Sequence, residues 1–107
     1  IYIEHIKRKI TKHNYIELDK HIMDQGFIVK KTYIGKNCFI GSGSVIDAGT
    51  ILGKQCIIGS NTVLSGIYPD YCVIVGAPGK IVKRYDENTK KWKKTNTQGK
   101  FIEDDLL

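Results

Sequence analysis

Three histidines, His5, His13 and His21, are the side chains best suited to acid–base chemistry in this chain of 107 residues. The imidazole pKa lies close to neutral pH, so a histidine can accept a proton from a reacting hydroxyl at working pH. Three histidines can also converge on a catalytic zinc ion. The elements that carry these residues decide which chemistry is open to them.

Basic side chains form a second group with chemical potential. The formal charge is +6, from 17 Lys and Arg against 11 Asp and Glu, and the excess lies in "KRKITKH" and "KRYDENTKKWKK". Such patches indicate an anionic partner, which is a nucleic acid, a membrane surface or a phosphorylated small molecule. A merely solvated surface is an equal alternative. One Trp and no spaced aromatic residues disfavour nucleic acid.

The three cysteines, Cys38, Cys56 and Cys72, are an odd number and argue against a disulfide framework. We expect them to be reduced, buried and small in a cytoplasmic protein. No apolar run approaches the roughly 18 residues that span a bilayer, and charges interrupt the first residues where a signal peptide would need an apolar run. Because the sequence lacks an initiator Met, we expect a processed chain or a fragment.

A six-residue period positions these groups. In "IGKNCFIGSGSVIDAGTILGKQCIIGSNTV", residues 34–63, every sixth position is aliphatic, and Leu64 continues the series. The fifth position of each unit is always small, and the fourth is rich in Gly and Asn, which tolerate positive φ. A corner every six residues bends a strand into a coil, and "IGKNCFIGSGSV" returns as "LGKQCIIGSNTV" after eighteen residues. These periods predict a three-sided coil of short parallel strands, and a sandwich of short strands is the alternative.

Residues 34–69 make only two coils, and stacked repeats generally need about three. The missing support must come from upstream coils, from the segment before Ile34 or from neighbouring subunits. Residues 1–12 alternate loosely and suit one side of an earlier coil, and residues 13–31 read as a loop that ends in the strand "GFIVKKTYIG". Residues 72–75 suit one more buried strand. We expect a domain over residues 1–85 and a partly ordered tail over 86–107, with a short helix around Trp92, which covers a neighbouring surface.

The segment "IGKNCFIGSGSVIDAGTILGKQCIIGSNTVLSGIYPDYCVIVGAPGKIVKRY" resembles the C-terminal half of the hexapeptide-repeat acetyltransferases, and most closely the sugar and polysaccharide O-acetyltransferases. "ITKHNY" and "IMDQGF" are similar to the segment that carries their catalytic histidine. The likeness covers residues 10–93. It implies an all-β fold, a left-handed parallel β-helix built from hexapeptide repeats, with an excursion loop and an irregular C-terminal tail. It also implies a homotrimer with active sites between subunits.

The reaction implied by this resemblance is acetyl transfer from acetyl-CoA to a hydroxyl of a sugar or glycan, by direct attack on the thioester. His13 falls where the catalytic base of the family falls, although the preceding residue is Lys12 where relatives often carry Asp or Asn. His21 is the reserve candidate, and His5 is most simply a strand surface residue. Glu17 or Asp19 is placed to orient an imidazole, and the spacing singles out neither.

The resemblance also assigns the donor site. Gly41, Ser42, Gly59 and Ser60 would lie along the pantetheine arm, Gly76, Ala77 and Pro78 beside the adenine, and Phe39 near the thiol end. Lys80, Lys83 and Arg84 are candidates for the phosphates. Plain coil geometry is the alternative for each glycine, and a solvated surface is the alternative for the lysines. No metal is expected.

Two other functions stay open. One is a zinc enzyme similar to the γ-class carbonic anhydrases, for which the three histidines lie outside the regular coils. The other is a non-catalytic or incomplete β-helix that binds partners. Within the acetyltransferase hypothesis, the acceptor is a capsule or lipopolysaccharide sugar, a free sugar or a xenobiotic, and transfer to an amine also stays open.

Overall fold

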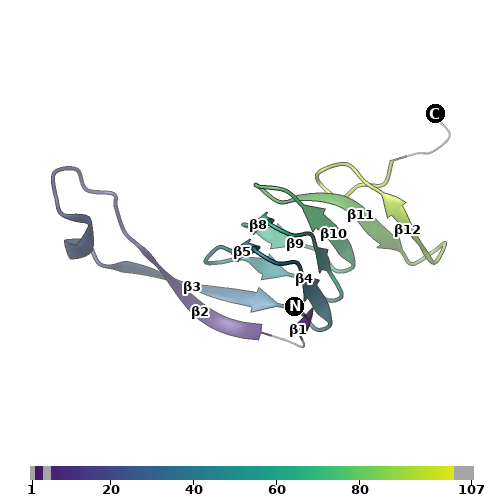
Figure 1. The fold of residues 1–107 in the computed structure, drawn as a ribbon, viewed down its shortest axis with the longest axis horizontal. Helices are drawn as coiled ribbons and strands as arrows, with labels where there is room; N and C mark the ends of the chain where they lie inside the picture. Colours follow the sequence, from purple (N-terminus) through teal and green to yellow (C-terminus); the bar gives the residue numbers. More distant parts are fainter. Residues whose placement is uncertain (1, 4–5, 103–107) are drawn as a thin grey trace.

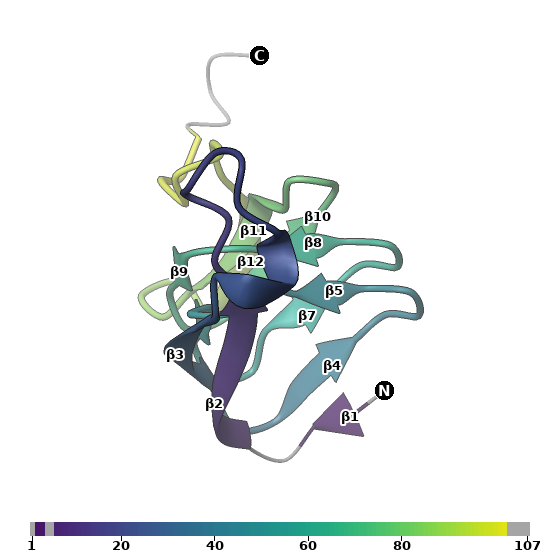
Figure 2. The ribbon, with the colours of Figure 1, turned by 90° about the vertical axis from the view of Figure 1, so that its left-hand side faces the viewer.

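Short strands stack in three parallel ladders in the computed structural model, which describes residues 2–3 and 6–102 (Figure 1). The first ladder joins β3 (Phe27–Ile34), β6 (Ile51–Leu52) and β9 (Ile67–Tyr68). The second joins β4 (Cys38–Ile40), β7 (Ile57–Ile58) and β10 (Cys72–Val75). The third joins β5 (Val45–Ile46) to β8 (Val63–Leu64). In Figure 2 the three ladders lie on three sides of a coil.

The register confirms the period of eighteen residues. Tyr33 pairs with Ile51, and Phe39 pairs with Ile57 one face later. The aliphatic positions of the repeat fill the interior, because Ile34, Ile40, Leu52, Ile58 and Leu64 are buried and Ile46 packs partly buried against them. Six is a multiple of two, so the alternation of a strand keeps every sixth residue on the inner side. The predicted all-β coil of short parallel strands is therefore confirmed.

The corners lie at the fourth position of each unit, as predicted. Their backbones adopt φ values from 50° to 86°, in the left-handed region that favours Gly and Asn, at Asn37, Gly43, Gly49, Gln55 and Asn61. Repeated left-handed residues turn the chain from one face to the next, which is why the strands from β4 to β9 are only two or three residues long.

The second coil is two residues shorter than the first. Ile51 pairs with Ile67, sixteen residues later, so Tyr68 occupies the inner position beside Leu52. Tyr68 is buried, and its hydroxyl donates to the Ser65 carbonyl at 2.9 Å and accepts from the Ser65 N–H at 3.0 Å. The Tyr68 phenol thus fills the shortened corner and satisfies both backbone hydrogen-bonding groups of Ser65 there.

The segment before the coil is a long antiparallel hairpin. β2 (Ile6–His13) pairs with β3 from Ile6 opposite Ile34 to His13 opposite Phe27. We call β2, β3 and the loop of residues 14–26 between them the arm, which projects away from the coil in Figure 1. The expectation of an earlier parallel coil in residues 1–12 is wrong for the described part, because β2 runs against β3. The loop is also shorter than the predicted 13–31 and contains the 3-10 turn η1 (Ile22–Asp24).

The coil ends in antiparallel strands. β1 (Tyr2–Ile3) pairs with β4, and β11 (Lys80–Asp86) pairs with β10 and then with β12 (Lys91–Lys94). The second ladder thereby becomes a six-stranded sheet in the order β1-β4-β7-β10-β11-β12. The predicted irregular tail with a helix at Trp92 is wrong, because Trp92 lies in β12 and contacts the Tyr85 ring at a centroid distance of 5.6 Å. The division of the chain at residue 86 stays a prediction.

No helix in residues 2–3 and 6–102 has the length and apolar character needed to cross a bilayer.

Candidate functional site

His13 is the last residue of β2, where the arm gives way to its loop. Its backbone pairs with Phe27, and the next N–H, that of Asn14, donates to the Gly26 carbonyl at 3.1 Å. This agrees with the predicted place of the candidate base at a strand end and loop start. The assignment of His13 as the base stays a prediction.

The loop of the arm is held by its own side chains. The Gln25 amide donates to the Glu17 and Lys20 carbonyls at 3.0 Å each, and its Oε1 accepts from the Glu17 N–H at 2.9 Å. Glu17 also pairs with Lys20 at 3.0 Å. His21 is exposed, and its Nδ1 accepts from the Met23 N–H at 3.2 Å, which caps η1. His21 therefore has a local structural role, and His5 lies outside the described residues.

The small residues assigned to the donor site come together in one corner of successive coils, between the second and third ladders. We call this column the seam. The registers that align β4, β7 and β10 stack its members, which are Gly41, Ser42, Gly59, Ser60, Gly76, Ala77 and Pro78. Ser42, Ser60, Gly76, Ala77 and Pro78 are exposed, so the backbone of this corner carries little side-chain cover.

The stacking of the coils is enough to explain why residue 41 is a glycine, and no ligand is needed for that explanation. A Cβ at Gly41 would lie 2.5 Å from the Ser60 nitrogen, closer than two non-bonded atoms can approach. Gly41 also donates its N–H to the Ile58 carbonyl at 2.8 Å. A Cβ at Gly59 would lie 2.9 Å from Cγ1 of Val75, which is a side-chain atom and not backbone, so the coil constrains Gly59 less tightly than Gly41.

Phe39 and Lys80 flank the seam. Phe39 lies on the outer face of β4, 52% exposed, two residues before Gly41. Lys80 begins β11 opposite Val75, directly after the exposed turn at Pro78. Each residue thus lies two positions along the chain from a member of the seam, and the assignment of both to the donor site stays a prediction.

Lys83 and Arg84 point to opposite sides of the sheet. The register of β10 and β11 shifts, so that Ile74 faces Ile81 while Val73 faces Lys83, and Val82 is an extra residue. Lys83 therefore shares the outer face with the half-buried Val73, whereas Arg84 pairs with the buried Cys72. The Arg84 guanidinium donates to the Gly99 carbonyl at 3.2 Å. Four residues of strand separate it from Lys80, about 13 Å, so Arg84 is not brought to the seam.

Lys94 is a further cation on this face, and the sequence pattern does not single it out. It lies in β12 directly opposite Lys83, and neither lysine forms an ion pair with another residue in the part of the chain that the structure describes. Like charges in directly opposite positions destabilise a sheet, so this pair favours an anion between them. The lysine-rich segment of residues 90–94 is the available signal, but the sequence predicts an irregular tail there.

The three cysteines are free and buried, as predicted. The Cys38 thiol donates to the Gly53 carbonyl at 3.2 Å, and the Cys56 thiol to the Pro69 carbonyl at 3.4 Å. Contact with Cys38 lowers the pKa of Cys56, but contact with Cys72 and burial outweigh it and raise this pKa to about 12. At the end of the column, contact with Cys56 and the nearby Arg84 charge lower the pKa of Cys72 despite its burial.

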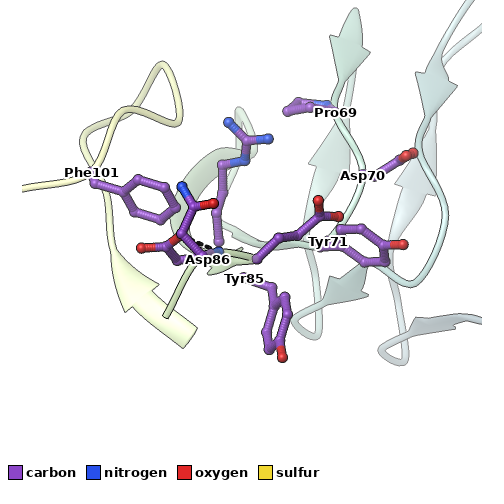
Figure 3. Close-up of a pocket in the computed structure, with 9 residues that line it drawn as sticks. Pro69, Asp70, Tyr71, Tyr85, Asp86 and Phe101 are labelled. Atoms are coloured by element: carbon purple, nitrogen blue, oxygen red, sulfur yellow. Dashed lines mark hydrogen bonds between the residues drawn. The ribbon is translucent and has the colours of Figure 1, made fainter. Parts of the chain in front are cut away.

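Two pockets lie at the corner between β9 and β10, away from the seam. The larger has a volume of about 430 Å³ and is drawn in Figure 3, lined by Pro69, Asp70, Tyr71, Arg84, Tyr85, Asp86, Glu87, Asn88 and Phe101. The other, of about 340 Å³, is lined by Gln55, Tyr71, Tyr85, Glu87 and Trp92. The sequence pattern does not predict these pockets, since they form only when β12 folds back on β11.

Within residues 2–3 and 6–102, no group of three or more His, Cys, Asp or Glu is arranged to hold a metal ion.

Comparison with known proteins agrees with the repeat and the fold. Residues 31–65 match the family model described as the hexapeptide repeat of succinyl-transferase. The structure is similar to the crystal structure of a maltose O-acetyltransferase from Clostridium difficile 630, with 28% sequence identity and a TM-score of 0.54 over 70% of this chain. The chain spans about two fifths of that protein, 41% of its length. No curated protein matches the chain by sequence.

Proposed function

Because this chain resembles the hexapeptide-repeat acetyltransferases of the sugar O-acetyltransferase kind, we propose that it takes part in acetyl transfer from acetyl-CoA to a sugar or glycan hydroxyl. The observation that carries the proposal is the seam, in which three successive corners present small residues in one column beside Phe39 and Lys80. A long donor with amides along its arm needs such an exposed backbone edge.

The cations beside the seam suit the phosphates of coenzyme A. Lys80 follows the exposed turn at Pro78, and Lys83 faces Lys94 across the outer sheet. A phosphate between Lys83 and Lys94 would relieve their mutual repulsion. Arg84 was also a candidate, but its guanidinium is bound to Gly99 near the opposite corner, so we propose Lys94 in its place.

In the proposed reaction, His13 acts as general base. The acceptor hydroxyl oxygen attacks the thioester carbon while the imidazole takes its proton, and the tetrahedral oxyanion is stabilised by backbone N–H groups. The carbon–sulfur bond then breaks, and the leaving thiolate takes the proton from the imidazolium. The products are an acetyl ester and free coenzyme A, so no other reactant is needed.

We further propose that the coil is left-handed, as the resemblance implies, and that the protein is a cytoplasmic homotrimer with its active sites between subunits. Supporting the trimer, the outer faces of the coil carry exposed apolar residues, with Phe39 beside Ile57 on one face and Ile51 beside Ile67 on another. A neighbouring subunit on one of these faces would cover apolar surface and turn the open seam into a groove.

The test is an acceptor screen that measures release of free thiol from acetyl-CoA. We expect His13→Ala to turn over at least about a hundredfold more slowly than the wild type, with unchanged affinity for coenzyme A by calorimetry. His21→Ala is the matched control. It should keep the turnover of the wild type, because the His21 imidazole is engaged in capping η1 and is not the proposed base. Equal turnover in His13→Ala and the wild type would remove His13 from the mechanism.

A non-catalytic binding role is the second candidate, because the chain spans only 41% of the maltose O-acetyltransferase that it resembles. Hydrolysis of acetyl-CoA and transfer to an acceptor should be measured separately. Binding of coenzyme A with neither activity would favour the binding role, and transfer to any sugar would exclude it.

A further inference from the structure

The two pockets near Tyr71 form one surface away from the seam, because Tyr71, Tyr85 and Glu87 line both of them. We call it the aromatic corner, made by the residues that line either pocket. It lies at one end of β10 and the seam lies at the other, with Tyr71 and Gly76 five residues apart, about 17 Å along the strand. The volumes of about 430 and 340 Å³ fall in the range of small-molecule sites.

Three rings from three segments form a fixed apolar row. Tyr71, in the corner before β10, meets Tyr85 of β11 at a centroid distance of 6.2 Å, and Tyr85 meets Trp92 of β12 at 5.6 Å. Both pairs are edge-to-face, at interplanar angles of 66° and 67°. Trp92 is 39% exposed, so the row presents ring surface to a ligand. A further ring, Phe101, closes the larger pocket on its far side in Figure 3.

Planar polar groups surround these rings. Asp70 accepts the Lys54 N–H at 2.9 Å, and Asp86 accepts the Asn88 N–H at 3.0 Å, so both carboxylates are held in place. Glu87 lines both pockets, and its carboxylate forms no hydrogen bond or ion pair with another residue of the described chain. Carboxylates and amides bind pairs of adjacent hydroxyls, and Gln55 lines the smaller pocket with Glu87.

The charges of this corner balance within the protein. Lys93 binds Asp86 at 2.9 Å and also lies over the Phe101 ring, 5.9 Å from its centroid. Lys54 lies over the Tyr71 ring at 5.6 Å. Together with Arg84, these lysines offset the three carboxylates, and each already lies over one ring face that a cationic ligand would seek, at Phe101 and at Tyr71. The corner therefore favours an uncharged ligand.

We propose that the aromatic corner binds a neutral saccharide, whose C–H faces stack on Tyr85 and Trp92 and whose hydroxyls bind Glu87 and Gln55. A pyranose combines an apolar face with a rim of hydroxyls, which matches a row of rings edged by carboxylate and amide groups. The site is separate from the seam and binds saccharide whether or not the chain transfers acetyl groups.

The test uses Trp92, the single tryptophan of the chain, whose fluorescence reports on this corner. Maltoheptaose, cellohexaose and the hexamer of N-acetylglucosamine are titrated into the wild type, and at least one should change the emission saturably. Glu87→Gln and Tyr85→Ala should each weaken that binding about tenfold or more. Tyr15→Ala, which removes an exposed tyrosine of the arm, is the matched control and should bind as the wild type.

Three outcomes would overturn the proposal. One is no response to any of the three oligosaccharides by fluorescence or by saturation-transfer NMR. Another is unchanged affinity in both Glu87→Gln and Tyr85→Ala, and the third is a response to tetramethylammonium in place of the sugars. Coenzyme A is titrated into the same samples to test the proposed function separately. If coenzyme A does not bind, the proposed function is contradicted, and the saccharide result is unaffected.

Discussion

Cys56 shows how the interior of the coil changes the pKa of a single thiol. Contact with Cys38 favours its ionised form, but contact with Cys72 and burial prevail and raise the pKa to about 12. The thiol of the unfolded chain ionises near pH 8.5. Its contribution to stability is therefore complete below about pH 8.5 and is lost as pH rises through the folded pKa.

We therefore predict that the free energy of unfolding falls between about pH 8.5 and 12, and that it falls less in Cys56→Ala, which has no thiol to ionise. Denaturant titrations at several pH values measure both slopes. Cys56→Ala will be less stable at pH 8 because it leaves a small cavity, so the slopes are compared and not the absolute stabilities. Identical slopes in the two proteins would contradict the prediction.

At the scale of residues, the sequence predicts the interior well and the outer site only in part. The fixed places of small, aliphatic and Gly or Asn residues define which side chains point inward and where φ is positive. Arg84 shows where this fails. Strict alternation from Lys80 would place Arg84 on the same side of β11, but the extra residue Val82 reverses the alternation. A bulge depends on the partner strand, which local pattern does not contain.

Among the elements, the parallel ladders depend on their buried aliphatic positions. Leu52 of β6 is fully buried, with Ile34 and Tyr68 on either side of it in the first ladder. We predict that Leu52→Ala lowers the free energy of unfolding by about 2–5 kcal/mol, through lost burial and the cavity that remains. Denaturant unfolding monitored by circular dichroism measures the loss.

Leu18→Ala is the matched control, because it makes the same chemical change at a side chain that is 90% exposed in the arm. Its effect should stay within about 0.5 kcal/mol. Equal losses in Leu52→Ala and Leu18→Ala would show that the inner column does not support the coil.

The elements at both ends of the coil were the least predictable. Alternation in residues 6–13 indicates a strand but does not reveal whether its partner runs parallel or antiparallel, which depends on how the chain turns beyond it. The lysine-rich β12 reads as a solvated tail, since charged residues on an edge strand look like disorder in sequence. Only the pairing of β12 with β11, which includes the Asp86–Lys93 ion pair at 2.9 Å, distinguishes an edge strand from a disordered tail.

For the whole molecule, the outer apolar faces predict assembly. We expect light scattering to give a mass of three chains, each of 12.1 kDa. Ile57 is 43% exposed on the outer face of β7, so Ile57→Lys should shift the trimer towards monomer by placing a charge in the contact. Lys36→Ala, on an exposed polar corner, should leave the mass unchanged. A monomeric wild type would contradict the proposed trimer.

The reversal of the chain after β10 has a consequence for aggregation. Open ends of a stacked parallel coil are templates on which another copy could add, and repetition of that step would build a fibril. In this chain β11 and β12 extend the six-stranded sheet in the antiparallel sense, and β12 carries Lys91, Lys93 and Lys94. A second molecule that approached this edge of the six-stranded sheet would meet concentrated positive charge, which disfavours the addition of another copy there.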